Sequence, residues 1–312
     1  MWTTTPAVKE VKAVAMALGS SSVSALALEQ RIRREILHKS ELIPSLPEVV
    51  LEVLSLVNDR GAEIEQFESL LKNDGPLVAK MLRVVNSPFY AVSSHVTSIG
   101  QAVMVLGFRS LRSLVLAAST ANYMERDYGC YGFEAKGLWK HAIAVASGAR
   151  TLASHLRKSA DTREAVFVAG LLHDIGKMLL APYLRDLGKT IDPALGSAGQ
   201  EREYLGIDHQ EAGKLVAEKW ALSPMVCEVL AHHHNETCAP EHRICHAIVR
   251  VANQYSNAQG IGLAEVAPDD AFVPEASELD ILGLNEENWL DAAFDMREAV
   301  EAAQSTLSNL GA

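Results

Sequence analysis

The sequence predicts an all-α protein, and three observations support this fold class. Apolar residues recur at intervals of three and four along most of the chain, which is the period of an amphipathic helix. Sustained alternation of apolar and polar residues, which marks a half-buried strand, is nearly absent. The Asp74-Gly75 pair is followed by a proline, so it does not indicate a hairpin. With 312 residues, 48% of them hydrophobic and 21% charged, the chain can bury a large core.

Prolines and glycines divide the N-terminal part into short helices. The first predicted helix covers residues 7–39, and Pro44 and Pro47 prevent its continuation. Thr97 or Ser98 is a candidate N-cap, and Gly107 a candidate end, for a later helix. The helices expected in this part cover residues 49–57, 64–71, 77–85, 99–106 and a stretch that starts at 108.

The C-terminal part has longer apolar stripes and two polar interruptions. A helix is expected over 165–180, ending near Pro182. The Gly/Ser-rich stretch 192–200 and the acidic stretch 259–278 are expected to be surface loops. An amphipathic helix over 286–309 should close the chain. Further helices are expected at 138–155, 207–220, 223–232 and 247–254.

Charge and cysteine content narrow the class of protein. A formal net charge of −11 repels nucleic acid and anionic lipid, so we expect neither DNA nor a membrane as a partner. No apolar run reaches the ~18 uncharged residues that a membrane span needs. The four cysteines form no Cys-x-x-Cys pair and no disulfide framework, which favours a reducing, cytoplasmic location.

The segment 170–177, Gly-Leu-Leu-His-Asp-Ile-Gly-Lys, carries the strongest functional signal. On a continuous helix His173 and Lys177 share one face, and Asp174 points about 100° away from His173. An imidazole and a carboxylate suit a divalent cation such as zinc, iron or manganese. The lysine one turn later could hold an anion, such as a phosphate, beside that cation. Alone, a His-Asp pair is more often structural than a ligand set.

Further histidines at the ends of separate helices raise the number of candidate ligands. A two-metal site needs several neutral imidazoles and a carboxylate that can bridge, and Asp174 could bridge. Two metal ions ~3.5–4 Å apart would lower the pKa of a bridging water and hold the attacked phosphate. The histidines concerned are His141, His173, His209, His232, His233 and His234.

The order of these residues resembles the HD superfamily of metal-dependent phosphohydrolases. Asn253 stands where catalytic members have an aspartate, so it offers a neutral oxygen and one metal position should be weaker. The residues that match are His141, the His173-Asp174 pair with Lys177, His209, His232 and His233. The ligands expected to be strongest are His173, Asp174, His209 and His232, followed by His141 and His233, with Asn253 last.

Upstream motifs narrow the resemblance to the HDOD family, the HD-related output domain of bacterial signalling proteins. These motifs lie at 43–47, 74–76, 82–90 and 98–107. The resemblance implies an all-helical fold and a regulatory role, because the metal ligands of this family are usually eroded. The resemblance places an HDOD domain at 43–255, with subdomains 43–120 and 121–255. On either side of it, the residue pattern predicts a helical extension at 1–42 and, at 256–312, a loop and amphipathic helix that pack on the domain.

The ligand set is also similar to that of HD-GYP cyclic-di-GMP phosphodiesterases. The chain lacks their Asp-Gly-x-Gly-Tyr-Pro stretch after the paired histidines, where residues 235–240 read Asn-Glu-Thr-Cys-Ala-Pro. Gly137 occupies the position of a glutamate that these enzymes often have one turn before the first histidine.

Together these features predict a bacterial signal-transduction protein with an HD-type site for one or two divalent transition-metal ions (Fe, Mn, Zn or Ni). It would act mainly through signalling proteins or through a nucleotide or phosphate ligand. One alternative is a phosphohydrolase acting on a nucleotide or cyclic dinucleotide, with Asp174 and Lys177 as catalytic residues. Another is nucleotide binding without turnover. The sequence leaves enzymatic activity open.

Overall fold

The computed structural model describes residues 22–38, 44–57, 61–86, 94–264 and 271–308, and a few single residues between them. The described residues form helices and short 3-10 turns, and the extended pairing among them is an isolated bridge between Phe133 and Leu263. The predicted all-α class is therefore confirmed. The first predicted helix is described as α2 (Ser22–His38), and its remaining residues lie outside the described segments.

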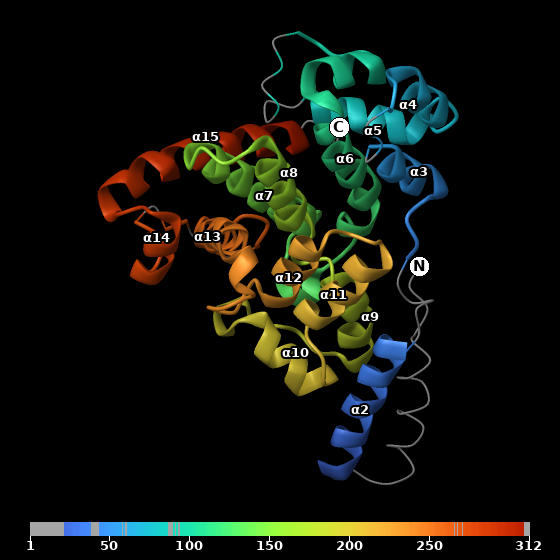
Figure 1. The fold of residues 1–312 in the computed structure, drawn as a ribbon. Coiled ribbons are helices and arrows are strands. Elements are labelled where there is room, and N and C mark those ends of the chain that lie inside the picture. The colour runs from blue at the N-terminus through green and yellow to red at the C-terminus, as the bar shows by residue number, and fades with distance from the viewer. Residues whose placement is uncertain are drawn as a thin grey trace.

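One end of the molecule is a cluster of short helices around the first half of α6. The helices α3 (Glu48–Val57), α4 (Ile64–Leu71) and α5 (Gly75–Val85) pack against α6 (Ile99–Met124) (Figure 1). The predicted boundary at Gly107 is a kink inside α6, because Gly107 has a φ of 80° that interrupts the helical backbone.

The other end is built around α7 (Gly137–His155). This helix packs against α8 (Ala160–Leu172), α13 (Arg243–Ala258) and α15 (Glu286–Ser308) (Figure 1). The segment after α13 returns toward the start of α7, where Leu263 forms the bridge with Phe133 described above. The short helix α14 (Ala276–Leu282) precedes α15.

Small residues bring α7 and α8 close together. A Cβ on Gly170 would lie 3.0 Å from the Cα of Ala146 and 3.0 Å from the carbonyl oxygen of Val145. On another side of α7, a Cβ on Gly148 would lie 3.2 Å from the side chain of Met296. This close packing brings the first turns of α7 beside the C-terminal end of α8, where the segment 170–177 leaves the helix.

The helix predicted over 165–180 is in fact two helices. His173 ends α8, and α9 (Lys177–Leu187) begins four residues later. Between them, backbone hydrogen bonds join residues that are three apart. One of these bonds runs from the Lys177 N–H to the backbone carbonyl oxygen of Asp174 at 3.0 Å. Gly176 allows this turn to lie against the first residue of a later helix, His209. A Cβ at position 176 would come within 2.0 Å of the His209 carbonyl oxygen.

Three other predicted boundaries are wrong. The expected loop 192–200 includes the start of α10 (Ser197–Leu205), which packs on α2 and α9 and is stabilised by those contacts rather than by an apolar stripe of its own. The expected loop 259–278 includes the start of α14, which a capping box at Glu275 and Glu278 stabilises. Pro182 lies inside α9, which continues to Leu187.

The remaining helices are α11 (His209–Lys219) and α12 (Pro224–His232), which pack against each other.

In the described part of the chain, Ile99–Met124 and Ala160–Leu187 have the length and hydropathy of a membrane span. However, 61% and 89% of their apolar 18-residue windows are buried inside the fold. Core helices of soluble domains share this property, so these two give no indication of membrane insertion.

Candidate metal centre

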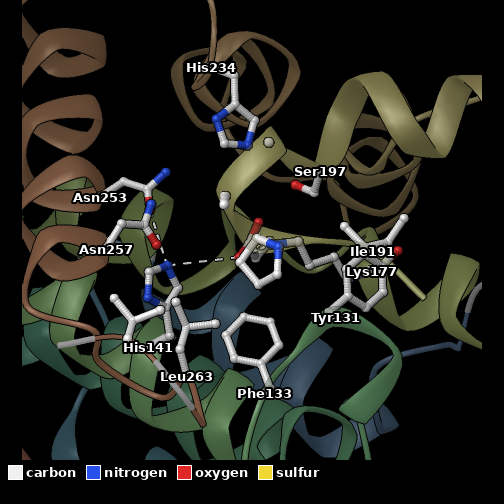
Figure 2. A pocket seen from close by; sticks show the side chains of 15 residues that line it. Tyr131, Phe133, His141, Lys177, Ile191, Ser197, His234, Asn253, Asn257 and Leu263 are labelled. Carbon is white, nitrogen blue, oxygen red and sulfur yellow. Dashed lines mark hydrogen bonds and ion pairs between the residues drawn. The ribbon is translucent and has the colours of Figure 1, made fainter.

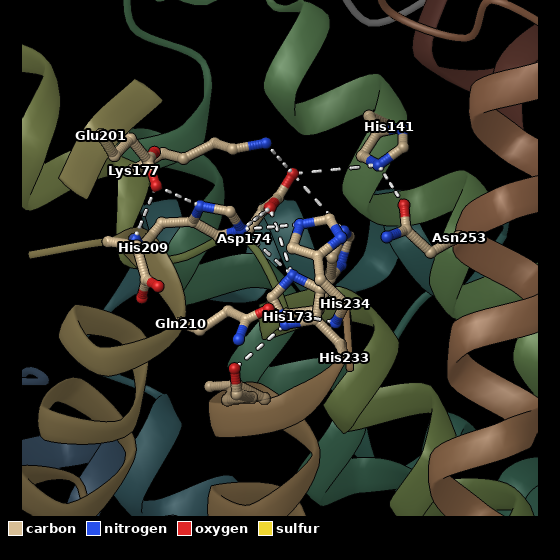
Figure 3. Close-up of polar contacts among 12 residues, drawn as sticks. His141, His173, Asp174, Lys177, Glu201, His209, Gln210, His233, His234 and Asn253 are labelled. Carbon is tan, nitrogen blue, oxygen red and sulfur yellow. Dashed lines mark hydrogen bonds and ion pairs between the residues drawn. The ribbon is translucent and has the colours of Figure 1, made fainter. Parts of the chain in front are cut away.

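The turn between α8 and α9 places the buried Asp174 at the centre of a group of imidazoles, of which His234 is exposed and the others are buried (Figure 3). His141 projects from the first turns of α7, and His209 is the first residue of α11. His233 and His234 directly follow α12. Side chains far apart in the sequence meet because the ends of these helices converge on one point.

The two oxygens of Asp174 face different donors. Oδ1 lies 3.3 Å from Nε2 of His209 and 3.8 Å from Nε2 of His233. Oδ2 lies 3.4 Å from Nε2 of His173 and 3.9 Å from Nε2 of His141. The possible metal ligands form two sets that share Asp174. We call them the three-histidine group (Asp174, His209, His233, His234) and the two-histidine group (His141, His173, Asp174). In each group, one ligand atom per residue lies within 4.8 Å of the ligand atoms of the other members.

Three of the imidazoles are oriented through their Nδ1 atoms. His173 and His233 each donate from Nδ1 to the backbone carbonyl three residues earlier, at 2.7 and 3.0 Å. His209 donates from Nδ1 to Oε2 of Glu201 at 2.6 Å. Because a neutral imidazole carries one proton, Nε2 of each presents a lone pair. Carbonyl and carboxylate partners of this kind orient metal-binding histidines in proteins.

The Nε2 atoms of the three-histidine group lie close together, and those of His209 and His233 present lone pairs. The Nε2 atoms of His209 and His233 are 3.2 Å apart, and those of His209 and His234 are 3.0 Å apart. No group in the described residues donates a hydrogen bond to Oδ1 of Asp174 beside them. Buried acceptors without donors are unfavourable unless a cation lies among them. Imidazole and carboxylate donors therefore fit a divalent transition metal here.

Burial keeps two of the imidazoles neutral. It lowers the pKa of His141 to about 3, with a further contribution from the nearby His173, and it lowers the pKa of His233 to about 3. Burial alone would raise the pKa of Asp174, but Lys177 and the adjacent imidazoles hold that pKa well below its usual range. At neutral pH His141 and His233 are therefore neutral and Asp174 is an ionised carboxylate, which are the states that bind a metal.

The two-histidine group has additional partners. The residue Lys177 is 7% exposed, and its Nζ donates to Oδ2 of Asp174 at 2.7 Å. Nε2 of His141 lies 3.0 Å from Oδ1 of Asn253, and Asn257 donates to that same oxygen at 3.1 Å. Because the turn follows a three-residue repeat, Lys177 meets Asp174 rather than His173, which the sequence had placed on its face.

A pocket of about 330 Å³ opens beside the two-histidine group (Figure 2). Its walls include Tyr131 and Phe133, and Nζ of Lys177 lies 5.5 and 5.3 Å from the centres of these two rings. His234, from the turn after α12, and Asn257, from α13, also line it. This volume, with aromatic walls and a few polar groups, is in the range of small-molecule sites.

His232 does not join the cluster, contrary to the sequence prediction, and His234 does. His232 is the last residue of α12, its side chain is 38% exposed, and its Nε2 lies 3.7 Å from Glu228 on the same helix. The helix ends at His232, and the turn that follows directs His233 and His234 toward the cluster. The other predicted residues are together as expected: His141, His173, Asp174, Lys177, His209, His233 and Asn253.

Glu201 is a site residue that the sequence analysis did not identify. It is fully buried, and its Oε2 accepts hydrogen bonds from both Nδ1 and the backbone N–H of His209, at 2.6 and 2.8 Å. Burial would raise the pKa of Glu201, but His209 lowers it below its usual value. A glutamate in a Gly/Ser-rich stretch carries no local signal for this role, because only the tertiary fold brings α10 to α11.

Gly137 cannot be replaced by the glutamate of HD-GYP enzymes in this fold. A Cβ at this position would lie 2.1 Å from the carbonyl oxygen of Gly262. Gly262 itself has a φ of 82°, and Glu134 donates to its carbonyl at 3.0 Å. The loop after α13 therefore occupies the space that a side chain at position 137 would need.

Comparison with known proteins identifies the class. The family model of the HDOD domain matches residues 43–236, so the chain belongs to the HDOD family. An uncharacterized protein of Treponema pallidum (strain Nichols) is 23% identical over 216 residues. That match covers 68% of this chain, and the chain spans about two-fifths (41%) of the length of this relative.

Solved structures share the fold. An HDOD domain protein of unknown function from Geobacter sulfurreducens is 24% identical, with a TM-score of 0.68 over 90% of this chain and 98% of that one. A Shewanella amazonensis SB2B protein provisionally named a metal-dependent phosphohydrolase is 18% identical, with a TM-score of 0.63 over 89% and 98%. A Marinobacter aquaeolei VT8 protein provisionally named a signal transduction protein is 21% identical, with a TM-score of 0.67 over 98% and 65%.

Proposed function

We propose that this HDOD protein is a signal-transduction protein whose HD-type cluster binds a divalent transition metal and which acts mainly through regulatory contacts with a protein or small ligand. One observation carries the metal-binding part, namely the Nε2 atoms of His209 and His233, 3.2 Å apart beside Oδ1 of Asp174. A cation among these atoms would remove the repulsion between buried lone pairs. Membership of a signalling family supports the regulatory part.

The donor chemistry narrows the choice of metal. Calcium and magnesium prefer all-oxygen sites, whereas imidazole nitrogen with one carboxylate suits Fe, Mn, Zn or Ni. We propose one or two such ions per chain. A bound ion would supply Lewis acidity and lower the pKa of a coordinated water. Lys177 stands at the pocket beside Asp174, where its ammonium group could bind an anionic oxygen of a ligand.

Metal content tests this proposal directly. Untagged protein purified without chelator should contain at least one transition-metal ion per chain by plasma mass spectrometry. The double variant His173→Ala, Asp174→Ala should lose it, whereas Asp280→Ala on the exposed face of α14 should not. Wild-type protein that stays metal-free after equilibration with Fe, Mn, Zn and Ni would contradict the proposal.

A second candidate function is phosphoester hydrolysis, and the pocket favours it. The pocket reaches both Asp174 and Lys177, so a phosphorylated ligand could approach the cluster from solvent. Metal-loaded protein should then hydrolyse cyclic-di-GMP or another phosphodiester, and Lys177→Met should remove that activity. A regulatory protein would show no turnover in the same assay.

Ligand binding without turnover is distinguished by calorimetry. Titration with cyclic-di-GMP and with guanosine tetraphosphate should give heat of binding if the pocket takes a nucleotide. Silence with both ligands, together with recovery of a defined protein partner in a pull-down, would instead support contacts between proteins as the mode of regulation.

A further inference from the structure

The two oxygens of Asp174 are not equally available. Oδ1 receives no hydrogen bond from the described residues, whereas Oδ2 accepts one from Lys177 at 2.7 Å. The Lys177 ammonium therefore already places a positive charge on the side of Oδ2. A second cation on that side would lie close to this charge in a buried environment, where repulsion is stronger than in water.

The Nε2 atom of His141 is also already in use. It lies 3.0 Å from the amide of Asn253, within hydrogen-bond distance. In the orientation that Asn257 supports, by donating to the same Oδ1 at 3.1 Å, the His141 nitrogen carries the proton and donates it. If the Asn253 amide were turned, its NH₂ would donate to the nitrogen lone pair instead. Either arrangement engages the nitrogen that faces Asp174.

The number of available donors therefore differs between the two groups. Of the two nitrogens that face Asp174 in the two-histidine group, Nε2 of His173 has no hydrogen-bond partner in the described residues, whereas Nε2 of His141 is engaged by Asn253. In the three-histidine group, His209 and His233 present Nε2 lone pairs, Asp174 presents Oδ1, and His234 presents Nε2. Four protein donors make up the coordination number that zinc usually has.

We infer that the chain binds a single metal ion, held by Asp174, His209, His233 and His234, and that Asn253 together with Lys177 prevents a second ion from binding at His141 and His173. The inference rests on the proposed metal-binding function and specifies which donors are used. An aspartate at position 253 could not donate to His141 and would add a negative charge, so it would open the second position.

Metal stoichiometry of matched variants tests the inference. We would load wild type, Asn253→Asp and Asn285→Asp with zinc or manganese, remove free metal by gel filtration, and measure the content per chain. Asn285→Asp is the control, because it adds the same charge at an exposed position outside the cluster and keeps the side-chain oxygen that accepts from Asn288 N. The expected values are one ion for wild type, two for Asn253→Asp and one for Asn285→Asp.

Two alanine variants cover the case in which Asn253→Asp does not fold. His141→Ala should retain the single ion with an affinity within about threefold of wild type, whereas His234→Ala should bind it at least tenfold more weakly. Two ions in wild type, or a loss of the ion in His141→Ala, would overturn the inference and leave the proposed function standing. No ion in any form would overturn both.

Discussion

The two groups around Asp174 contain the same kinds of residue but differ in what surrounds them. In the three-histidine group, Glu201 and a backbone carbonyl occupy the outer nitrogens of His209 and His233, which leaves the inner nitrogens free. In the two-histidine group, an amide engages the inner nitrogen of His141, and an ammonium contacts the shared carboxylate. The comparison shows that partners and charge, rather than the number of histidines, determine where a cation fits.

The largest effect is expected from the residue that both groups share. Asp174→Asn should abolish stoichiometric metal binding, because Asp174 is one of the four donors proposed for the single ion. It should also destabilise the metal-free protein by about 3–5 kcal/mol, because it leaves the buried ammonium of Lys177 without a counter-charge. Metal analysis and urea unfolding in chelator measure the two effects. Asp280→Asn, on the surface, should change neither, and full metal retention in Asp174→Asn would show that the carboxylate is not a ligand.

The next effect concerns the backbone that holds the two groups together. Gly176→Ala would place a Cβ 2.0 Å from the His209 carbonyl oxygen and 2.7 Å from the Gly213 nitrogen. Overpacking of this kind should reduce the free energy of unfolding by about 3 kcal/mol. Gly199→Ala is the control, since its Cβ meets nothing within 4 Å, and it should be neutral or stabilise by up to ~1 kcal/mol. Equal stabilities of the two variants would contradict the close approach.

A change at Glu201 should weaken metal binding by the three-histidine group, because Glu201 contacts His209 and neither histidine of the two-histidine group. Glu201→Gln removes the carboxylate that orients His209, and losses of this kind usually reduce metal affinity about 10- to 100-fold. Zinc affinity measured by competition with a chromogenic chelator would show this. Glu203→Gln, exposed on the same helix, should bind like wild type. An unchanged affinity in Glu201→Gln would mean that the three-histidine group does not hold the ion.

The smallest effect is a pH dependence to which both groups contribute. Burial holds the pKa of His141 and of His233 at about 3, against ~6.5 in an unfolded chain. Between these values the unfolded chain binds protons that the folded protein does not. The free energy of unfolding of the metal-free protein should therefore fall as the pH drops below ~6.5, by up to ~1.4 kcal/mol per pH unit for each histidine.

Urea unfolding in chelator at pH 7.5, 6.5 and 5.5 measures this slope. His141→Gln should flatten it by the contribution of one histidine, whereas His95→Gln, on the surface, should leave it unchanged. A slope that is the same in all three proteins would show that these imidazoles are not held neutral by burial.

The fold was predictable because its main signals are local. Stripes of apolar residues located α3, α4, α7 and α15 almost to the residue, and Gly107 marked the kink in α6. The short helices α10 and α14 were missed, since they are stabilised by caps and by neighbouring helices. The break after His173 was missed because it depends on the close approach of Gly176 to a distant helix.

Most residues of the site could be predicted from the sequence, but which of the three consecutive histidines join it could not. Conspicuous histidines and the His-Asp pair identified most of the cluster. The exchange of His232 for His234 depends on where α12 ends, and three consecutive histidines contain no signal for that end. The roles of Glu201 and of the Asn253–His141 contact depend on tertiary geometry, so the asymmetry between the two groups became visible only in the structure.

Anomalous diffraction from crystals of the zinc-loaded protein, recorded on both sides of the zinc absorption edge, tests the central claim most directly. The account predicts one anomalous peak within coordinating distance of Asp174 Oδ1 and the Nε2 atoms of His209, His233 and His234. A peak at His141 and His173, or crystals of zinc-treated protein without any peak in the cluster, would contradict it.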